Sequence, residues 1–203
     1  MQANSLVVLD FETTGLSPNM GDRAIEIGAV KIKNGEITES FSQLMDPGFR
    51  ITGFIEDYTG ISNHMLKGMP SCAQVMGEFS DFIGDSNLVA HNASFDKRFL
   101  DAELALLSKS YSGQFACSML MARRIYQNAP THKLGDLIRY KNIPSDGGFH
   151  RALYDSQMTV KLWLTMLEDI KQDYGLKDIS FSLVKKLIKT PKKSVHEFLN
   201  NQK

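Results

Sequence analysis

Two short apolar runs in this chain each lead into an acidic motif, and this arrangement restricts the fold more than any other feature. Leu6 to Leu9 is continuously apolar and ends at Asp10-Phe11-Glu12. Residues 87–90 form a second run, which is followed by His91-Asn92-Ala93-Ser94-Phe95-Asp96. Short apolar runs of this kind are typical of strands buried in the centre of a sheet. We therefore expect two central strands, each followed closely by a carboxylate.

Turn residues and hydrophobic periodicity predict the other elements. Asn34-Gly35 is a strong hairpin signal between two strands. Residues 46–70 are rich in Gly, Pro, Asp and Asn, which predicts mostly loop. The expected strands are 24–32, 36–45 and 114–117, and the expected helices are 71–83, 94–107, 118–126, 134–141 and 151–170. This order predicts an α/β domain with a mixed sheet flanked by helices.

The length of 203 residues fits a single domain with a short appendage. No run of about 18 apolar residues is present, so we expect no membrane segment. The first five residues lack the basic region of a signal peptide, which indicates a cytoplasmic protein. Cys72 and Cys117 lack metal-binding spacing and fit buried thiols in a reducing compartment.

The formal net charge of zero conceals an asymmetry. Residues 175–203 carry seven lysines and two acidic residues, a net charge of +5, so residues 1–174 carry −5. We therefore divide the chain into a catalytic domain at 1–174 and a basic, partly helical C-terminal tail at 175–203.

Within the tail, four apolar residues recur at helical spacing: Leu183, Val184, Leu187 and Ile188. This stripe must be buried, either against the catalytic domain or against a partner protein. Lys185, Lys186 and Lys189 fall on the opposite side, where they are expected to be free to meet phosphates.

Asp10 and Glu12 lie two positions apart at the end of a strand, so their side chains leave the same face of the sheet. Two carboxylates held this way repel each other unless a cation lies between them. Hard oxygen ligands with no adjacent cysteine or histidine pair favour Mg²⁺ or Mn²⁺ over Zn²⁺. Asp96 and Asp155 bring the set to four carboxylates, which suits two divalent cations beside a phosphodiester.

His150 precedes Asp155 by five positions. On one helix this spacing separates two side chains by roughly 140°. The two can act together if Asp155 is in the helix and His150 is on the loop after Gly147-Gly148. A histidine with a pKa near 6.5 suits a general base at neutral pH.

Two further features concern substrate contacts. Thr13-Thr14-Gly15 follows the first acidic motif, and a tight turn there would leave backbone N–H groups for a sugar hydroxyl or a phosphate. Phe95 fits either a core position or a platform for a base, and both interpretations are open from its own context.

Three ordered stretches resemble the DEDDh family of 3′–5′ exonucleases, with the closest likeness to the proofreading epsilon subunit of bacterial replicative DNA polymerase. They are Leu9–Leu16, Leu88–Asp96 and His150–Asp155, with weaker likeness at Arg23–Val30 and Gly60–Ser62. The resemblance covers about residues 5–170.

The resemblance implies a ribonuclease H-like fold and a two-metal hydrolysis that releases nucleoside 5′-monophosphates from single-stranded DNA 3′ ends. By position, Asp10, Glu12 and Asp155 hold the first Mg²⁺ or Mn²⁺. Asp10 also touches the second metal, to which Asp96 contributes, and His150 deprotonates the attacking water. The residues implied to contact the terminal nucleotide are Thr13, Thr14, Gly15, Ile61, Asn92 and Phe95. This chain has Thr59 at the position where epsilon-type relatives often carry histidine.

Two alternatives stay open. The same scaffold trims RNA ends in ribonuclease T and oligoribonuclease. A non-catalytic adaptor is a different class, but an adaptor has no need of all five acidic and histidine residues. By analogy with the epsilon subunit, the tail is a candidate contact for a DNA polymerase or another protein.

Overall fold

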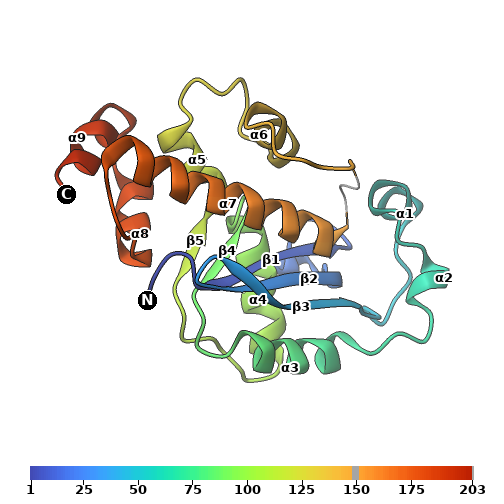
Figure 1. Cartoon of the computed structure of the whole chain (residues 1–203). Helices are drawn as coiled ribbons and strands as arrows, with labels where there is room; N and C mark the ends of the chain where they lie inside the picture. The colour runs from blue at the N-terminus through green and yellow to red at the C-terminus, as the bar shows by residue number, and fades with distance from the viewer. Residues whose placement is uncertain (148–150, 203) are drawn as a thin grey trace.

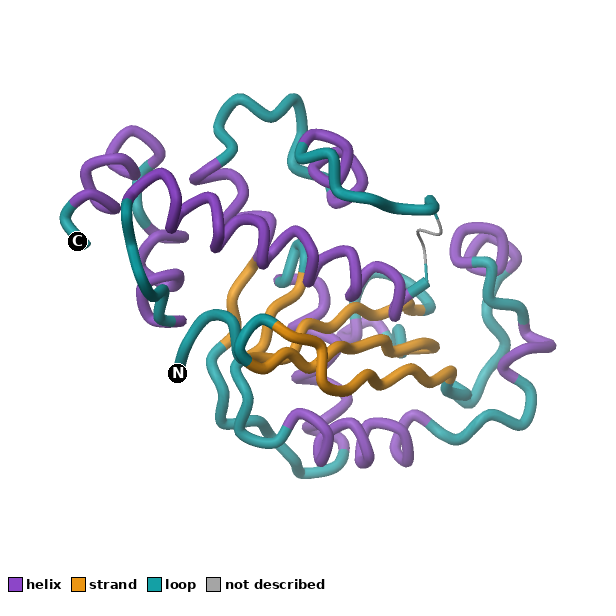
Figure 2. Tube along the Cα trace, viewed as in Figure 1, coloured by secondary structure: helices purple, strands orange, loops and turns teal. Residues whose placement is uncertain are grey.

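The computed structural model describes residues 1–147 and 151–202. A five-stranded mixed sheet forms its centre, in the order β3-β2-β1-β4-β5 (Figure 2). The strands are β1 (Leu6–Thr13), β2 (Ala24–Lys33), β3 (Glu36–Leu44), β4 (Leu88–Ala90) and β5 (Phe115–Cys117). β1, β2 and β3 pair antiparallel, whereas β4 is parallel to both β1 and β5. The predicted α/β domain with a mixed sheet is therefore confirmed.

Helices cover both faces of the sheet (Figure 1). The long helix α7 (Ala152–Tyr174) crosses one face, while α3 (Cys72–Ile83) and α4 (Ser94–Leu106) lie on the other. The remaining helices are α1 (Gly53–Thr59), α2 (Asn63–Leu66), α5 (Ser118–Ile125), α6 (Leu134–Tyr140), α8 (Phe181–Lys189) and α9 (Val195–Asn200), with 3-10 turns η1 (Pro18–Met20) and η2 (Lys192–Ser194). No helix in the described ranges is long and apolar enough to cross a membrane.

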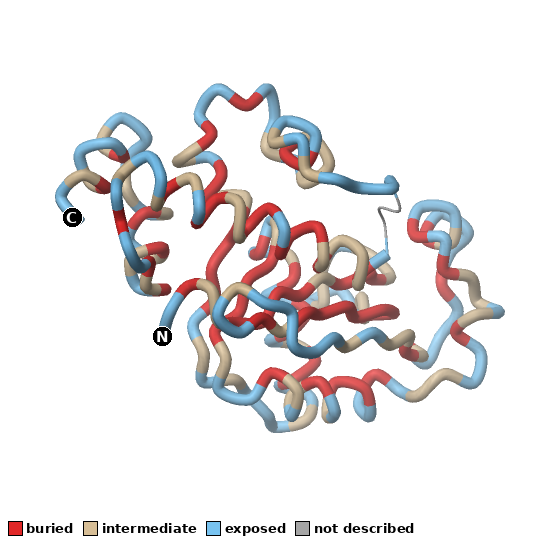
Figure 3. The backbone as a smooth tube through the Cα atoms, viewed as in Figure 1, coloured by how far each residue is buried: buried red, intermediate tan, exposed pale blue. Residues whose placement is uncertain are grey.

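The alternation of β1 assigns its side chains to two separate cores. Leu6 and Val8 pack with α7, whereas Val7, Leu9 and Phe11 pack with α3 and α4. Because side chains alternate along a strand, Asp10 and Glu12 continue the row that faces α7. Most residues of β1 and β2 are buried (Figure 3).

The prediction of a mostly irregular segment at 46–70 is wrong for two short helices, α1 and α2. Thr52 and Ser62 cap them, since their side chains accept hydrogen bonds from the N–H groups of Ile55 and Met65. Ile55 and Leu66 are buried in a small third core, together with Ile25, Ile51 and Ile61. These contacts explain how a Gly-rich segment becomes helical.

The long helix also differs from its predicted bounds. It continues four residues beyond Ile170, to Tyr174, and ends where Gly175 takes a left-handed conformation with φ of 68°. Such a glycine is a common helix stop because it lacks a Cβ.

The apolar stripe of the tail lies against the rest of the molecule. Phe181, Val184 and Leu187 of α8 are buried in the same core as α7, and Leu183 and Ile188 pack against it. The expectation for the lysines needs one correction: Lys185 is half-buried and its ammonium donates to the carbonyl oxygen of Phe115. Lys186 and Lys189 are exposed as expected.

Helix α7 approaches β2 closely at Gly28. A Cβ on Gly28 would lie 2.0 Å from the Leu153 backbone nitrogen and 2.2 Å from the Ala152 carbonyl carbon. The hydroxyl of Ser156, in the next turn, donates to the Gly28 carbonyl oxygen at 2.8 Å. Only a residue without a side chain permits this approach.

We predict that Gly28→Ala lowers the free energy of unfolding by about 3 kcal/mol, because the added methyl group forces rigid backbone apart. Gly77→Ala is the matched control: it lies within α3, and its added Cβ meets nothing within 4 Å. That change should raise stability by about 0.5 to 1 kcal/mol. Urea unfolding of both variants measures the difference, and equal effects would contradict the close approach.

Candidate active site

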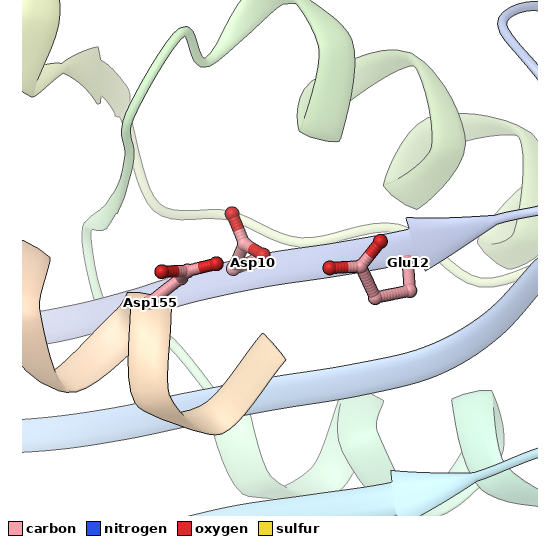
Figure 4. Close-up of side chains that lie close together, drawn as sticks. All are labelled: Asp10, Glu12 and Asp155. Carbon is pink, nitrogen blue, oxygen red and sulfur yellow. The ribbon is translucent and has the colours of Figure 1, made fainter. Parts of the chain in front are cut away.

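Three carboxylates converge at the end of β1. Oxygens of Asp10, Glu12 and Asp155 all lie within 4.8 Å of one another. Asp155 extends from α7 toward the two side chains on β1 (Figure 4). They line a cavity of about 550 Å³ that is bordered by α1 and the start of α4. The structure therefore brings together three of the four carboxylates expected to bind metal.

Two contacts with β2 fix the start of α7 and so place Asp155. The guanidinium of Arg151 binds the buried Glu26 carboxylate at 2.9 Å, and the Ala152 N–H donates to the same carboxylate at 3.2 Å. Glu26 pairs across the strands with Glu12, and Gly28 pairs with Asp10. Directly paired residues share a face of the sheet, so Glu26, which fixes the start of α7, lies beside Asp10 and Glu12.

Asp96 approaches the cluster from the opposite side, out of the first turn of α4. Its Oδ1 accepts a hydrogen bond of 3.2 Å from the Phe11 N–H, between the two acidic positions of β1. The side chain is 2% exposed and lines the same cavity. The fourth carboxylate is thus held beside the other three.

Burial and mutual repulsion raise the pKa values of these acids. Burial, followed by the charges of Asp96 and Asp155, raises the pKa of Asp10 well above its usual range. Burial and then Asp155 raise the pKa of Glu12 to about 8. Burial raises the pKa of Asp96 to about 7. The chain alone therefore favours protonated acids at this site.

This donor set fits divalent cations. Within the described part of the chain, the group of ligand atoms consists of carboxylate oxygens only. Mg²⁺ and Mn²⁺ prefer such oxygens. A bound cation also opposes the effects of burial and repulsion on these pKa values, because its positive charge favours the ionised carboxylates.

One histidine of the cavity can be assigned a structural role. His91 contacts the Ser118 hydroxyl through Nδ1 and the His132 carbonyl oxygen through Nε2, both at 2.9 Å. Burial lowers its pKa to about 4. Both ring nitrogens are engaged, so this neutral ring is poorly suited to take a proton from water. The predicted base, His150, lies outside the described residues.

The expected turn after β1 is present, although its three residues differ in position. Thr13 and Gly15 line the cavity, and the Thr13 hydroxyl donates to the Gly15 carbonyl oxygen at 2.6 Å. Thr14 does not line the cavity; its N–H donates to the Arg23 carbonyl oxygen at 2.9 Å. Thr14 therefore stabilises the turn. Arg23 in turn forms a bidentate pair with the buried Glu103 of α4.

Of the other three predicted substrate residues, two line the cavity and one does not. Asn92 and Phe95 line the cavity; Asn92 is left-handed, with φ of 65°, and its carbonyl oxygen accepts from the Phe95 N–H. Phe95 packs on Phe99, with ring centroids 5.1 Å apart, so it is both a core contact and a wall of the cavity. Ile61 is fully buried in the third core and does not line the cavity.

Two residues that the sequence reasoning missed border the cavity. Phe54 and Tyr58 of α1 stack with centroids 6.1 Å apart and an interplanar angle of 12°. They are 74% and 60% exposed, which is unusual for large aromatic side chains. Their spacing of four residues places them on one helix face, but the composition of residues 46–70 predicts mostly loop.

Comparison with known proteins shows the family to which this chain is similar. The family model RNase_T, described as an exonuclease, matches residues 7–163. A PolC-type DNA polymerase III of Caldanaerobacter subterraneus subsp. tengcongensis is 37% identical over 174 residues, which are 86% of this chain and 12% of that protein. A PolC-type DNA polymerase III of Halalkalibacterium halodurans is 40% identical over 167 residues, 82% of this chain and again 12% of the relative. The chain thus spans about an eighth of the length of these relatives.

Solved structures share the fold. Exonuclease X in complex with 5′ overhanging duplex DNA is 27% identical, has a TM-score of 0.66, and aligns over 81% of this chain and 92% of its own. The nuclease domain of 3′hExo, a DEDDh family member bound to rAMP, has a TM-score of 0.67 at 21% identity, over 82% of this chain and 92% of its own. The expected ribonuclease H-like fold and the resemblance to DEDDh exonucleases are confirmed. The chain belongs to the exonuclease family that the RNase_T model describes.

Proposed function

We propose that this chain hydrolyses phosphodiester bonds at the 3′ ends of single-stranded DNA and releases nucleoside 5′-monophosphates. The convergence of Asp10, Glu12 and Asp155 within one open cavity carries this proposal. The acidic body of the chain would otherwise repel a phosphate, so bound cations are needed for substrate to enter.

In this proposal Asp10, Glu12 and Asp155 hold one Mg²⁺ or Mn²⁺, and Asp10 and Asp96 hold a second. Two cations held by these residues would stabilise the charge that develops on the phosphodiester during hydrolysis. Asp96 keeps its position through the Phe11 N–H, and Asp155 keeps its position through the anchored start of α7. Glu26 and Arg151 are therefore positioning residues.

His150 is the proposed general base. It directly precedes Arg151, whose guanidinium is fixed to Glu26 beside the acidic cluster. The alternative ring in the cavity, His91, has both nitrogens engaged. A neutral imidazole can accept the proton of the attacking water, and histidine is the side chain whose unperturbed pKa, about 6.5, suits this task at neutral pH.

Phe54 and Tyr58 are the proposed platform for bases near the 3′ end. Aromatic side chains bind single strands by stacking, which tolerates any base sequence. Thr13, Gly15, Asn92 and Phe95 line the same cavity and are proposed to contact the terminal nucleotide.

A DNA polymerase is the proposed protein partner, because the similar curated proteins are DNA polymerase III chains. The apolar face of α8 is buried, so a partner would meet the exposed side of the tail.

The metal-free protein should lose stability as the pH rises from about 6.5 to 8. The folded pKa of Glu12 is about 8 and that of Asp96 about 7, above the values near 4 of an unfolded chain. The folded state therefore binds more protons in this range, and stability falls as pH rises. His91 has the opposite shift, but above its usual pKa of 6.5 it is mostly neutral in both states.

Mg²⁺ should reverse this loss, by about 2.7 kcal/mol at a hundredfold excess over its dissociation constant. Thermal unfolding with Mg²⁺ and with EDTA measures the effect, and Asp10→Asn is the control that removes one shared ligand. Equal shifts in the two proteins would contradict a metal site at Asp10.

Digestion of matched DNA and RNA oligonucleotides with Mg²⁺ tests the activity and the choice of sugar. We expect stepwise loss of nucleoside 5′-monophosphates from the 3′ end of DNA, and none from Asp10→Asn. His150→Ala should slow turnover by about 10²- to 10⁴-fold while the Mg²⁺ effect on stability persists. Preferential digestion of RNA would instead select the RNA-trimming alternative.

Replacing both Phe54 and Tyr58 by Ala should raise the KM for single-stranded DNA. Stacking contributes about 1 to 3 kcal/mol per base, which is roughly a five- to hundredfold change. Phe49→Ala is the control, since Phe49 is 49% exposed but does not line the cavity. Steady-state kinetics with an unchanged KM in the double variant would exclude the platform.

A further inference from the structure

A second pocket, of about 340 Å³, adjoins the active-site cavity across the start of α4. Ala93, Ser94 and Lys97 line this pocket, whereas Asn92, Phe95 and Asp96 line the active-site cavity. Because residues three or four apart share a helix face, the two sets lie on different sides of the same helical turn.

Lysines from two distant parts of the chain meet at this pocket. Lys97 comes from α4, while Lys185 and Lys189 come from α8 in the tail. Burial, and then the charges of Lys189 and Lys97, lower the pKa of Lys185. The Lys185 ammonium group therefore lies within electrostatic reach of those of Lys189 and Lys97.

The surroundings compensate this charge only in part. Among the described residues that line the pocket, none is Asp or Glu. Asp101 pairs with Lys97 from outside the lining. Phe115, Leu120 and Ile188 form an apolar floor, which strengthens the electrostatic field above it. An anion would relieve the repulsion.

The lysines of α8 are held in a fixed position. Two backbone hydrogen bonds join the segment before α8 to the N-terminus: Ala3 N–H to the Ile179 carbonyl oxygen, and Phe181 N–H to the Met1 carbonyl oxygen. α8 packs beside α5 and β5, at the edge of the sheet (Figure 1). A preorganised site pays less conformational entropy on binding than lysines on a flexible tail.

We propose that Lys97 and Lys189, beside the half-buried Lys185, bind a backbone phosphate of the polynucleotide substrate, upstream of the 3′ nucleotide held in the active-site cavity. This inference rests on the proposed function, because it assumes that a strand leaves that cavity past the start of α4. In this proposal the basic tail helps to bind the substrate. Its lysines differ in function, because Lys189 contacts the phosphate whereas Lys186 does not.

The salt dependence of binding tests this inequality in the full-length chain. The probe is a fluorescent single-stranded DNA that extends well beyond the cavity and carries a hydrolysis-resistant phosphorothioate at its 3′ linkage. The test variant is Lys97→Gln/Lys189→Gln, and the control is Lys177→Gln/Lys186→Gln. All four side chains are exposed, and both variants lose the same charge, so long-range electrostatics change alike.

Each lost phosphate contact on a single strand lowers the slope of log affinity against log salt by about 0.7, so the test variant, which loses one phosphate site, should lose about 0.7. The control should keep the slope of the unmodified chain. Equal slopes in the two variants would overturn the proposal. Hydrolysis of a trinucleotide by the unmodified chain with Mg²⁺ checks the proposed function separately. If the trinucleotide is not hydrolysed, both the proposed function and the phosphate site are wrong. If it is hydrolysed and the two variants have equal slopes, only the phosphate site is wrong.

Discussion

The close approach of α7 to β2 at Gly28 determines where the acidic groups of this chain can meet. Asp10 lies next to Gly28 on the paired strand, and Asp155 lies one turn into the helix that passes over this glycine. A Cβ at Gly28 would overlap the helix backbone, so any larger residue would move Asp155 away. Glu26 and Ser156 fix the same helical turn through hydrogen bonds. The metal-binding geometry is therefore a consequence of helix packing.

The cluster works against folding, and the rest of the structure must offset it. Burial raises the pKa values of Asp10, Glu12 and Asp96, and repulsion adds to the shift for Asp10 and Glu12, so ionised acids destabilise the metal-free chain. Two hydrophobic cores, one on each face of the sheet, supply the opposing stabilisation. A site that strains the apo protein is well suited to bind cations, because binding removes the strain. The same burial and repulsion of the carboxylates therefore lower the stability of the metal-free protein and favour the binding of cations.

The sequence predicted the sheet and most helices because their signals are local. Apolar runs, the Asn34-Gly35 turn and helical periodicity all act within a few residues. The acidic set was also accessible, since Asp10 and Glu12 share a strand face by alternation alone. The role of Gly28 was not accessible, because it depends on which helix crosses β2.

The remaining differences have the same cause. Ile61 fits a substrate contact by its motif, yet the third core buries it. Phe54 and Tyr58 had no local signal as substrate contacts, since only the tertiary position of α1 brings them to the cavity. The docking of α8, and with it the meeting of Lys189 with Lys97, likewise joins segments far apart in the sequence.

Anomalous scattering from crystals grown with Mn²⁺ tests the central claim most directly. The account predicts a strong peak between the carboxylates of Asp10, Glu12 and Asp155, and loss of that peak in Asp10→Asn. Both crystals must retain the contact between α7 and Gly28, so that a lost ligand is distinguished from a displaced helix. A wild-type crystal without a peak among these three carboxylates, at a Mn²⁺ concentration that supports hydrolysis, would contradict the account.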